Sequence, residues 1–160
     1  MTKILLSGLP GGGKTKLGDA LAADHSFFHA DMEADNWALT AEAHRDPEAF
    51  PRAFPDDRDV VLTWGFHPLV SLPVVQVLVE GGFTPVWLDG NRAHFFASFM
   101  RREHSSPIMA VFYHQQLERV TQARVLEAID WRIVDPFQPN GNFRPLDEIA
   151  AEIIEVALPS

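Results

Sequence analysis

Several features are missing from this sequence, and each absence excludes a class of protein. It contains no cysteine, so it has neither a disulfide framework nor a cysteine-ligated metal site. No apolar run approaches the roughly 20 residues that a membrane-spanning helix needs. The apolar run near the N-terminus is only a few residues long, which is too short for a signal peptide. We therefore expect a cytoplasmic protein with no membrane association.

Basic residues are also scarce. There are 13 Lys and Arg against 22 Asp and Glu, which gives a formal net charge of −9. A general DNA- or RNA-binding protein needs a basic face, and this composition lacks the surplus to form one. We expect no general nucleic-acid binding and interpret the acidic excess as a solvated surface. The oligomeric state stays open at this stage.

The length and composition fit one folding unit. The 160 residues are 46% hydrophobic and 22% charged, which is ordinary for a globular protein. A chain of this length suits one domain with one substantial core. We therefore expect a single domain over residues 1–160, without internal repeats.

The most specific motif is the run Gly8-Leu9-Pro10-Gly11-Gly12-Gly13-Lys14-Thr15. It fits the phosphate-binding loop pattern G-x-x-x-x-G-K-[ST] at every fixed position. Gly8, Gly11, Gly12 and Gly13 allow backbone N–H groups to turn toward the phosphates of a nucleotide. Lys14 is predicted to contact the β- and γ-phosphates, and the Thr15 hydroxyl to ligate Mg²⁺.

The context of this motif supports the same interpretation. Residues 3–7 form a short apolar run typical of a buried strand, and Lys14–Ala23 has the pattern of a helix. The order strand, glycine loop, helix places the phosphates at a helix N-terminus. The alternative, a glycine-rich turn that carries Lys and Thr by chance, does not account for this order. We predict ATP and Mg²⁺ as the cofactors.

Short apolar runs alternate with helix-like segments along the rest of the chain. This alternation predicts an α/β fold with a five-stranded parallel sheet flanked by helices, the P-loop NTPase fold. The expected strands are Ile4–Leu6, Phe27–Phe28, Val60–Thr63, Pro85–Leu88 and Trp131–Val134. The expected helices are Lys14–Ala23, Glu33–His44, Leu72–Glu80, Arg92–Glu103, Pro107–Ala128 and Leu146–Ala157. In such sheets ligands bind beyond the carboxyl ends of the strands.

Taken in order, the motifs resemble the shikimate kinase and gluconate kinase group, small P-loop enzymes that phosphorylate a hydroxyl of a metabolite. After the phosphate loop, Asp31-Met32-Glu33 lies where shikimate kinases have D-x-D. The strand Val60–Thr63 leads to Gly65, where that family has a glycine triplet. Residues 86–90 and then Arg101-Arg102-Glu103-His104 resemble the gluconate kinase pattern of a strand followed by a helix that ends in lid arginines.

The sequence departs from the shikimate kinases in the region of the acceptor. The glycine triplet is reduced to Gly65, and Glu33 replaces the second aspartate. The expected substrate arginine has no secure counterpart, with Arg52 and Arg58 as the alternatives. Shikimate itself is therefore doubtful as the acceptor.

Two carboxylates are candidates for the chemistry. Asp31 follows the second strand and is predicted to help hold Mg²⁺ and the acceptor, although Asp is also a common helix N-cap. Glu33 is a candidate acceptor-binding group or base, although an acid in the first helical turn is also favoured by the helix dipole. The strand that ends at Thr63 and Trp64 lacks the Walker B aspartate common in P-loop proteins.

The remaining candidates are arginines and aromatic residues. Arg101 and Arg102 are predicted to belong to a short lid, about residues 101–110, and to stabilise charge on the transferred phosphoryl group. Their alternative role is to complement the dipole at the helix C-terminus. Trp64 and His67 follow the third strand and are candidate acceptor contacts, although a strand-end tryptophan is often core. Residues 136–142 follow the last strand and are expected to border the base of the nucleotide.

These features predict an ATP-dependent phosphotransferase that acts on a hydroxyl of a small molecule, such as a sugar or sugar acid, with Mg²⁺. One alternative is a nucleoside or nucleotide kinase whose acceptor base stacks on Trp64 or Phe66. Another is a nucleotide-dependent switch or binding module with slow hydrolysis, which the missing Walker B aspartate keeps open.

Overall fold

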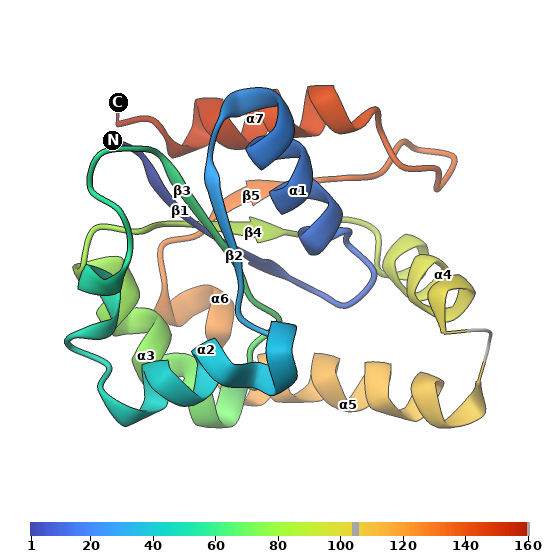
Figure 1. Cartoon of the computed structure of the whole chain (residues 1–160). Helices are drawn as coiled ribbons and strands as arrows, with labels where there is room; N and C mark the ends of the chain where they lie inside the picture. The colour runs from blue at the N-terminus through green and yellow to red at the C-terminus, as the bar shows by residue number, and fades with distance from the viewer. Residues whose placement is uncertain (104–105, 160) are drawn as a thin grey trace.

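The chain folds around one parallel sheet, and the computed structural model describes residues 1–103 and 106–159. Helices cover both faces of the sheet (Figure 1). The strands are β1 (Lys3–Gly8), β2 (Phe28–Asp31), β3 (Val60–Thr63), β4 (Thr84–Leu88) and β5 (Arg132–Val134). All neighbouring strands are parallel, in the order β2-β3-β1-β4-β5. The prediction of an α/β fold with a five-stranded parallel sheet is confirmed.

The central strands are apolar along their whole length because they are covered on both faces. In β1, Ile4, Leu5 and Leu6 are fully buried, and in β3 the whole run Val60–Thr63 is buried. Continuous rather than alternating hydrophobicity is the pattern expected of such strands.

The helices form two layers. On one face of the sheet α1 packs against α7, and on the other α3 contacts α2 and α5 (Figure 1). The bounds are α1 (Lys14–His25), α2 (Ala34–Arg45), α3 (Pro68–Glu80), α4 (Arg92–Arg102), α5 (Pro107–Gln122), α6 (Val125–Ala128) and α7 (Leu146–Ala157), with a short 3₁₀ helix η1 (Phe50–Ala53). None of the described helices is long and apolar enough to cross a membrane.

Helices α1, α2 and α4 differ from their predicted bounds by one or two residues, whereas two predictions differ by more. Helix α3 begins at Pro68, so that Pro73 lies inside it, because the rigid ring of Pro68 already suits the first helical position. The long helix predicted from Pro107 to Ala128 is divided into α5 and α6. Arg124 has φ 51° and reverses the backbone, and the following turn is held where Trp131 Nε1 donates to Val125 O at 3.0 Å.

The first turn of α2 is left-handed rather than the regular helix start that the sequence predicted. Asp35, Asn36 and Trp37 have φ of 50°, 54° and 62°. The regular right-handed helix follows this turn, and Thr40 Oγ1 donates to Met32 O at 2.8 Å across it. Residues 35–37 therefore form a tight projection directly after the Asp31–Glu33 segment.

The strand order places the functional edge of the sheet. From β1 the chain moves to β2 and β3 on one side, and then crosses to β4 and β5 on the other. Such a reversal leaves a crevice beyond the carboxyl ends of the strands around β1. Gly8 ends β1 there, and Asp31 ends β2 at the same edge.

Candidate functional site

The phosphate loop leaves β1 in a backbone conformation that only glycine adopts easily. Gly8 and Gly11 have φ of 148° and 87°. A Cβ atom on Gly8 would lie 2.6 Å from Leu88 O, and one on Gly11 would lie 2.5 Å from Phe95 O. Both positions therefore need glycine for its φ and for the close approach of β4 and α4.

The loop then enters α1, which supplies the positive end of a helix dipole. Gly13 is the N-cap with φ 80°, and Lys14 and Thr15 are the first helical residues. Gly12 comes directly before this N-cap, and its N–H makes a long hydrogen bond to Leu9 O at 3.4 Å. This arrangement leaves the loop amides and the free N–H groups of the first turn available to an anion.

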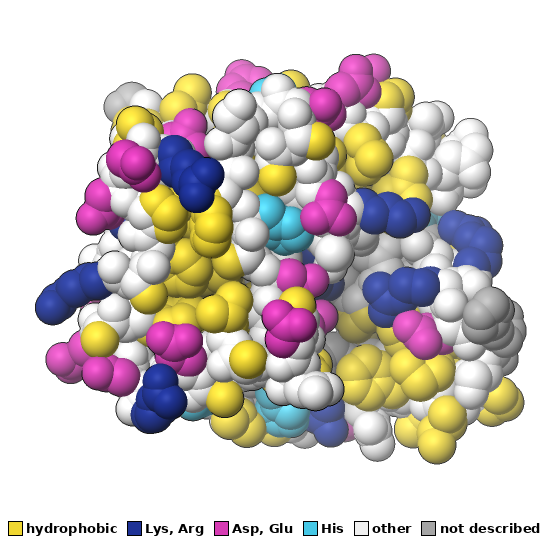
Figure 2. Space-filling model, in the orientation of Figure 1, with side chains coloured by type: hydrophobic (Ala, Val, Ile, Leu, Met, Phe, Trp, Pro, Cys, Tyr) yellow, Lys and Arg dark blue, Asp and Glu magenta, His cyan; other side chains and the backbone are white. Residues whose placement is uncertain are grey.

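A cleft of about 840 Å³ opens beyond this loop, within the size range of small-molecule sites. Figure 2 shows Lys and Arg side chains beside a hollow on the side of the molecule where α4 lies. The lining combines phosphate-loop, α2, α4 and α5 residues: Gly8, Pro10, Gly11, Gly13, Lys14, Thr15, Lys16, Glu33, Trp37, Gly65, Ser98, Phe99, Arg101, Arg102, Glu103, Met109, Phe112, Gln116 and Phe143.

Lys14 is the most perturbed basic group at the site. Its Nζ donates to Leu9 O at 3.2 Å. Burial lowers the pKa of Lys14 to about 8; nearby Arg102 lowers the pKa further, while Glu33 and Asp31 oppose the shift. Keeping the Lys14 ammonium charged therefore costs desolvation free energy, and the negative charge of a bound polyphosphate would offset that cost.

Thr15 and Asp31 place two oxygen atoms that could ligate a metal close together at the mouth of the loop. Thr15 Oγ1 donates to Asp31 Oδ2 at 3.1 Å, and Glu33 N donates to Asp31 Oδ1 at 2.9 Å. A hydroxyl and a carboxylate suit Mg²⁺, which prefers oxygen ligands and keeps several waters. Among residues 1–103 and 106–159 no group of three His, Asp or Glu side chains could hold a metal, so the remaining ligands would be water and phosphate.

Glu33 lies across the cleft floor from Lys14. Its Oε1 accepts a hydrogen bond from Gly65 N at 2.9 Å, and burial raises the pKa of its carboxyl group, against the effect of Lys14. A Cβ atom on Gly65 would lie 2.5 Å from Glu33 Oε1 and 3.5 Å from Lys14 Cε. Gly65 therefore leaves the space that the Glu33 carboxylate occupies, and a side chain at this position would displace it.

The structure places both predicted lid arginines on the cleft. Arg101 and Arg102 are exposed in the last turn of α4 and line it. Arg102 Nε donates to Glu103 Oε1 at 3.0 Å, and its guanidinium lies 5.2 Å from the centre of the Phe99 ring. His104 and Ser105, in the middle of the predicted lid, lie outside the described residues.

The structure does not bring Trp64 and His67 to the cleft. Trp64 is 1% exposed and packs against Phe66, which stacks on Trp131 in the core. His67 is half-buried at the N-terminus of α3. Trp64 Nε1 and His67 Nδ1 are buried and have no hydrogen-bond partner among the described residues. Phe66 is also buried, so an acceptor base cannot stack on Trp64 or Phe66 in this conformation.

Sequence reasoning missed several side chains that do line the cleft: Trp37, Phe112, Gln116 and Phe143. Phe143 lies close to Gly13 and packs on Phe137, so residues just after the predicted 136–142 segment reach the phosphate loop. Trp37 is 47% exposed although it is a large apolar residue. Its signal was the sequence Asp35-Asn36, since Asp and Asn tolerate left-handed backbone better than most residues.

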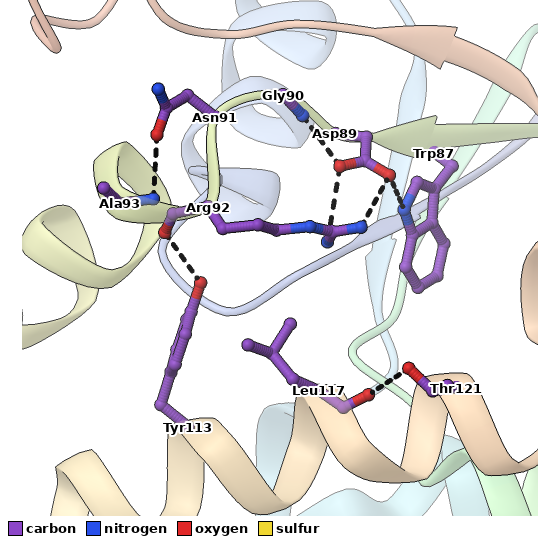
Figure 3. A network of polar contacts seen from close by, with 9 residues as sticks. All are labelled: Trp87, Asp89, Gly90, Asn91, Arg92, Ala93, Tyr113, Leu117 and Thr121. Carbon is purple, nitrogen blue, oxygen red and sulfur yellow. Dashed lines mark hydrogen bonds and ion pairs between the residues drawn. The ribbon is translucent and has the colours of Figure 1, made fainter.

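A polar network fixes the start of α4 against β4 (Figure 3). Asp89 accepts from Gly90 N at 2.8 Å and from Trp87 Nε1 at 3.2 Å, and it pairs with Arg92 at 3.3 Å. Tyr113 OH of α5 donates to Arg92 O at 3.2 Å. Asp89 therefore connects the end of β4 to the start of the helix that carries Arg101 and Arg102.

Comparison with known proteins places this geometry in context. No protein-family model matches the chain, and no curated protein matches its sequence. A gluconokinase from Sinorhizobium meliloti 1021 matches with a TM-score of 0.66 at 20% identity, over 98% of this chain and 91% of the gluconokinase. The shikimate kinase from Bacteroides thetaiotaomicron matches with a TM-score of 0.59 at 18% identity, over 97% of both chains.

A shikimate kinase from Acinetobacter baumannii, solved in complex with shikimate, gives a TM-score of 0.60 at 13% identity, over 98% of this chain and 92% of that one. At these identities the likeness concerns the fold. The chain has the fold of the small P-loop kinases of the shikimate and gluconate kinase group, as the order of its motifs indicated.

Proposed function

We propose that the protein transfers the γ-phosphoryl group of ATP to a hydroxyl of a small molecule, with Mg²⁺. The observation that carries this proposal is the convergence of Lys14, Thr15, Glu33 and Arg102 on one cleft beyond the carboxyl end of β1. The proteins of similar structure are a gluconokinase and shikimate kinases, which supports the same reaction class. A cytoplasmic location, where ATP is supplied, belongs to the same proposal.

Lys14 and the loop amides bind the β- and γ-phosphates. Phosphoryl transfer needs positioning and charge neutralisation more than covalent participation, so these fixed donors are the main contribution of the loop. Thr15 and Asp31 would hold Mg²⁺, which supplies further neutralisation of the phosphate oxygens when it is bound.

Glu33 is the better proton acceptor of the two carboxylates. Both oxygens of Asp31 already accept hydrogen bonds, from Thr15 Oγ1 and Glu33 N. Glu33 uses Oε1 for Gly65 N, and no hydrogen bond among the described residues engages its Oε2. The acceptor oxygen bonds to the γ-phosphorus, the bond from that phosphorus to ADP breaks, and the hydroxyl proton passes to Glu33.

Arg102 is the stronger lid candidate because it contributes to the electrostatic environment of both Lys14 and Glu33. Its guanidinium pairs with Glu103 at the rim of the cleft, with Arg102 Nε 3.0 Å from Glu103 Oε1. Closure of the lid would exchange this partner for the phosphoryl oxygens, as arginine fingers do. Arg101 lines the same rim and has no such contact with Phe99 or Glu103 among the described residues.

The test is ADP release from Mg-ATP with pooled sugars, sugar acids, polyols, nucleosides and nucleotides. We expect one pool to raise ADP release well above the background hydrolysis, with a phosphorylated product detected by mass spectrometry. Binding of ATP without any responsive pool would contradict the proposal and favour a nucleotide-dependent switch. Lys14→Ala serves as the negative control because it removes the phosphate-binding cation.

A further inference from the structure

We infer that the acceptor is an alcohol without negative charge whose flat ring face stacks on Trp37. This inference rests on the proposed function, because it names the class of molecule that the cleft offers to the γ-phosphate. It differs from the acids on which the proteins of similar structure are named to act, a sugar acid and shikimate.

Trp37 provides the stacking surface. It is the exposed tryptophan of the chain, at 47%, whereas Trp64, Trp87 and Trp131 are 1%, 1% and 8% exposed. It lines the cleft together with Glu33, which precedes it by four residues. A large indole left in water at a cleft wall loses the free energy of burial that a ligand face would restore. Trp37 therefore takes the role that the sequence suggested for Trp64.

The backbone that presents Trp37 is strained. Asp35, Asn36 and Trp37 are three consecutive residues with left-handed φ, and none of them is glycine. Left-handed backbone is unfavourable for L-amino acids, more so for Trp than for Asp and Asn, and strained backbone concentrates at ligand clamps and active sites. Exposure and strain are separate observations, and both single out this turn.

The charge of the acceptor side excludes an acid. Glu33 lies beside Trp37 on the wall, and Asp31 is hydrogen bonded to the Glu33 backbone. The two arginines that the sequence offered for a substrate carboxylate lie elsewhere. Arg52 lines a separate pocket next to Lys3, the first residue of β1, and Arg58 lies 4.9 Å from the Phe28 ring, at the first residue of β2.

In a parallel sheet the first residues of the strands lie at the edge opposite to their carboxyl ends. Arg52 and Arg58 therefore lie near the starts of the strands, at the edge of the sheet opposite to the cleft. The described cations of the cleft, namely Lys14, Lys16, Arg101 and Arg102, belong to the phosphate loop, α1 and the lid, where the triphosphate needs them. A carboxylate beside Glu33 would meet a like charge without a dedicated partner.

Helix α5 adds apolar side chains to the lining of the cleft. Phe112 and Met109 of α5 line it, and Phe112 is 42% exposed and stacks on Phe99 at 6.1 Å. An uncharged ring held between aromatic walls, with its hydroxyl toward Glu33, satisfies both the apolar surfaces and the carboxylate.

The test compares neutral and acidic acceptors of matched shape. The probes are adenosine and adenosine 5′-monophosphate, 4-hydroxybenzyl alcohol and 4-hydroxybenzoate, and glucose and glucuronate. Binding is measured by calorimetry with Mg²⁺ and a non-hydrolysable ATP analogue, and transfer is measured separately by ADP release. We expect a neutral member to bind about tenfold or more tightly than its acid, since stacking is retained and repulsion by Glu33 is removed.

The variants separate stacking from general damage. Trp37→Ala should raise the KM for the acceptor about tenfold or more and leave the KM for ATP unchanged, whereas Trp37→Phe should retain most of the affinity because it keeps a ring. Leu69→Ala, at an exposed apolar residue of α3 that does not line the cleft, is the matched control and should change neither constant.

The two proposals fail in different ways. Tight binding of a neutral ring compound that depends on Trp37, without a phosphorylated product, would contradict the kinase and leave the binding inference intact. Phosphorylation of an acid in preference to its neutral partner, an acceptor KM unaffected by Trp37→Ala, or binding by none of the neutral ring probes would overturn the inference.

Discussion

Lys14 is held among groups of both signs in a site that removes it from bulk water. Burial dominates and lowers its pKa to about 8, well below the ordinary value for lysine, while Glu33 and Asp31 only partly oppose this. In the free protein the ammonium is therefore present at neutral pH and is lost as the pH rises through about 8. A bound triphosphate favours the charged form, so binding of nucleotide and retention of the proton are linked.

This linkage predicts the pH dependence of nucleotide binding. Affinity for Mg-ATP should be nearly constant below about pH 8 and then fall by up to about tenfold per pH unit above it, because the proton must be taken up on binding. Calorimetric titrations from pH 7 to 10 measure the effect. In Lys14→Met the residual binding should be weak and independent of pH, and a constant wild-type affinity over that range would contradict the role of Lys14.

The two carboxylates should separate in mutant kinetics. Asp31→Asn weakens the oxygen pair with Thr15 and should lower transfer and raise the Mg²⁺ concentration for half-maximal rate. Glu33→Gln keeps an oxygen for Gly65 N but removes the base, so transfer should fall about 10²–10⁴-fold with the Mg²⁺ dependence unchanged. Steady-state rates over a range of Mg²⁺ distinguish the two, and identical profiles would show that both acids act as one unit.

If Glu33 accepts the proton as proposed, it should also set the acid limb of the rate. Its pKa is raised by burial, so the proton acceptor is lost as the pH falls through a value above the ordinary glutamate range. Loss of that acid limb in Glu33→Gln, with the remaining slow rate independent of pH, is the matching observation.

At the level of single residues the sequence placed the phosphate loop, Lys14, Thr15, Glu33, Arg101 and Arg102 at strand or helix ends, and the structure brings them to one cleft. Asp31 does not line the cleft itself and is hydrogen bonded to Thr15. Trp64 is buried in the core, and Gly65, one residue later, is the residue that lines the cleft. Side-chain direction at a strand end depends on the turn that follows the strand, and no periodicity reports it. Trp37 was not predicted as a site residue because the sequence predicted a regular helix over Glu33–His44, whereas Trp37 lies in a left-handed turn.

At the level of elements the β4–α4 junction determines how firmly the lid helix is held. Asp89 contacts Trp87 Nε1, Gly90 N and Arg92, and its side chain is 15% exposed. The indole of Trp87 is 1% exposed and relies on Asp89 for its N–H. The network is thus a partly buried polar connection between sheet and helix (Figure 3).

Removal of this connection should destabilise the protein. Asp89→Ala leaves Trp87 Nε1 unpaired and should lower the free energy of unfolding by about 1–3 kcal/mol. Asp89→Asn retains an acceptor oxygen and should cost less. Urea denaturation of both variants provides the measurement, and equal losses for the two would indicate that the ion pair with Arg92, rather than the indole hydrogen bond, carries the stability.

Element types were predictable because each has a strong local signal. Apolar runs of two to four residues marked the strands, Pro107 marked the start of α5, and Gly81-Gly82 follows the end of α3. The interruption at Arg124 was not predictable, since it goes with a contact between separate residues, the hydrogen bond from Trp131 to Val125. The turn 35–37 had a local signal in Asp35-Asn36, which the prediction of a regular helix did not use. Where intrinsic helix propensity and tertiary contacts favour different backbone conformations, the tertiary contacts determine the structure.

At the scale of the whole molecule, an acidic protein carries a basic cleft. The formal net charge is −9, yet Lys14, Lys16, Arg101 and Arg102 line the same opening. A cleft that concentrates cations on an acidic surface attracts a polyphosphate locally while repelling polyanions elsewhere. Binding of ATP should consequently weaken with added salt, because part of the attraction is screened.

Ligand binding to the native state alone should raise the thermal stability of the whole chain. At a free Mg-ATP concentration of about 100 times its Kd, the free energy of unfolding rises by about 2.7 kcal/mol. For a chain of this size that corresponds to a Tm increase of about 5–10 °C. Scanning calorimetry or thermal shift at several Mg-ATP concentrations gives the measurement. Lys14→Ala should lose most of the increase and still unfold cooperatively, because its side chain lines the cleft rather than the core; an increase of the same size in that variant would mean that ATP binds elsewhere on the molecule.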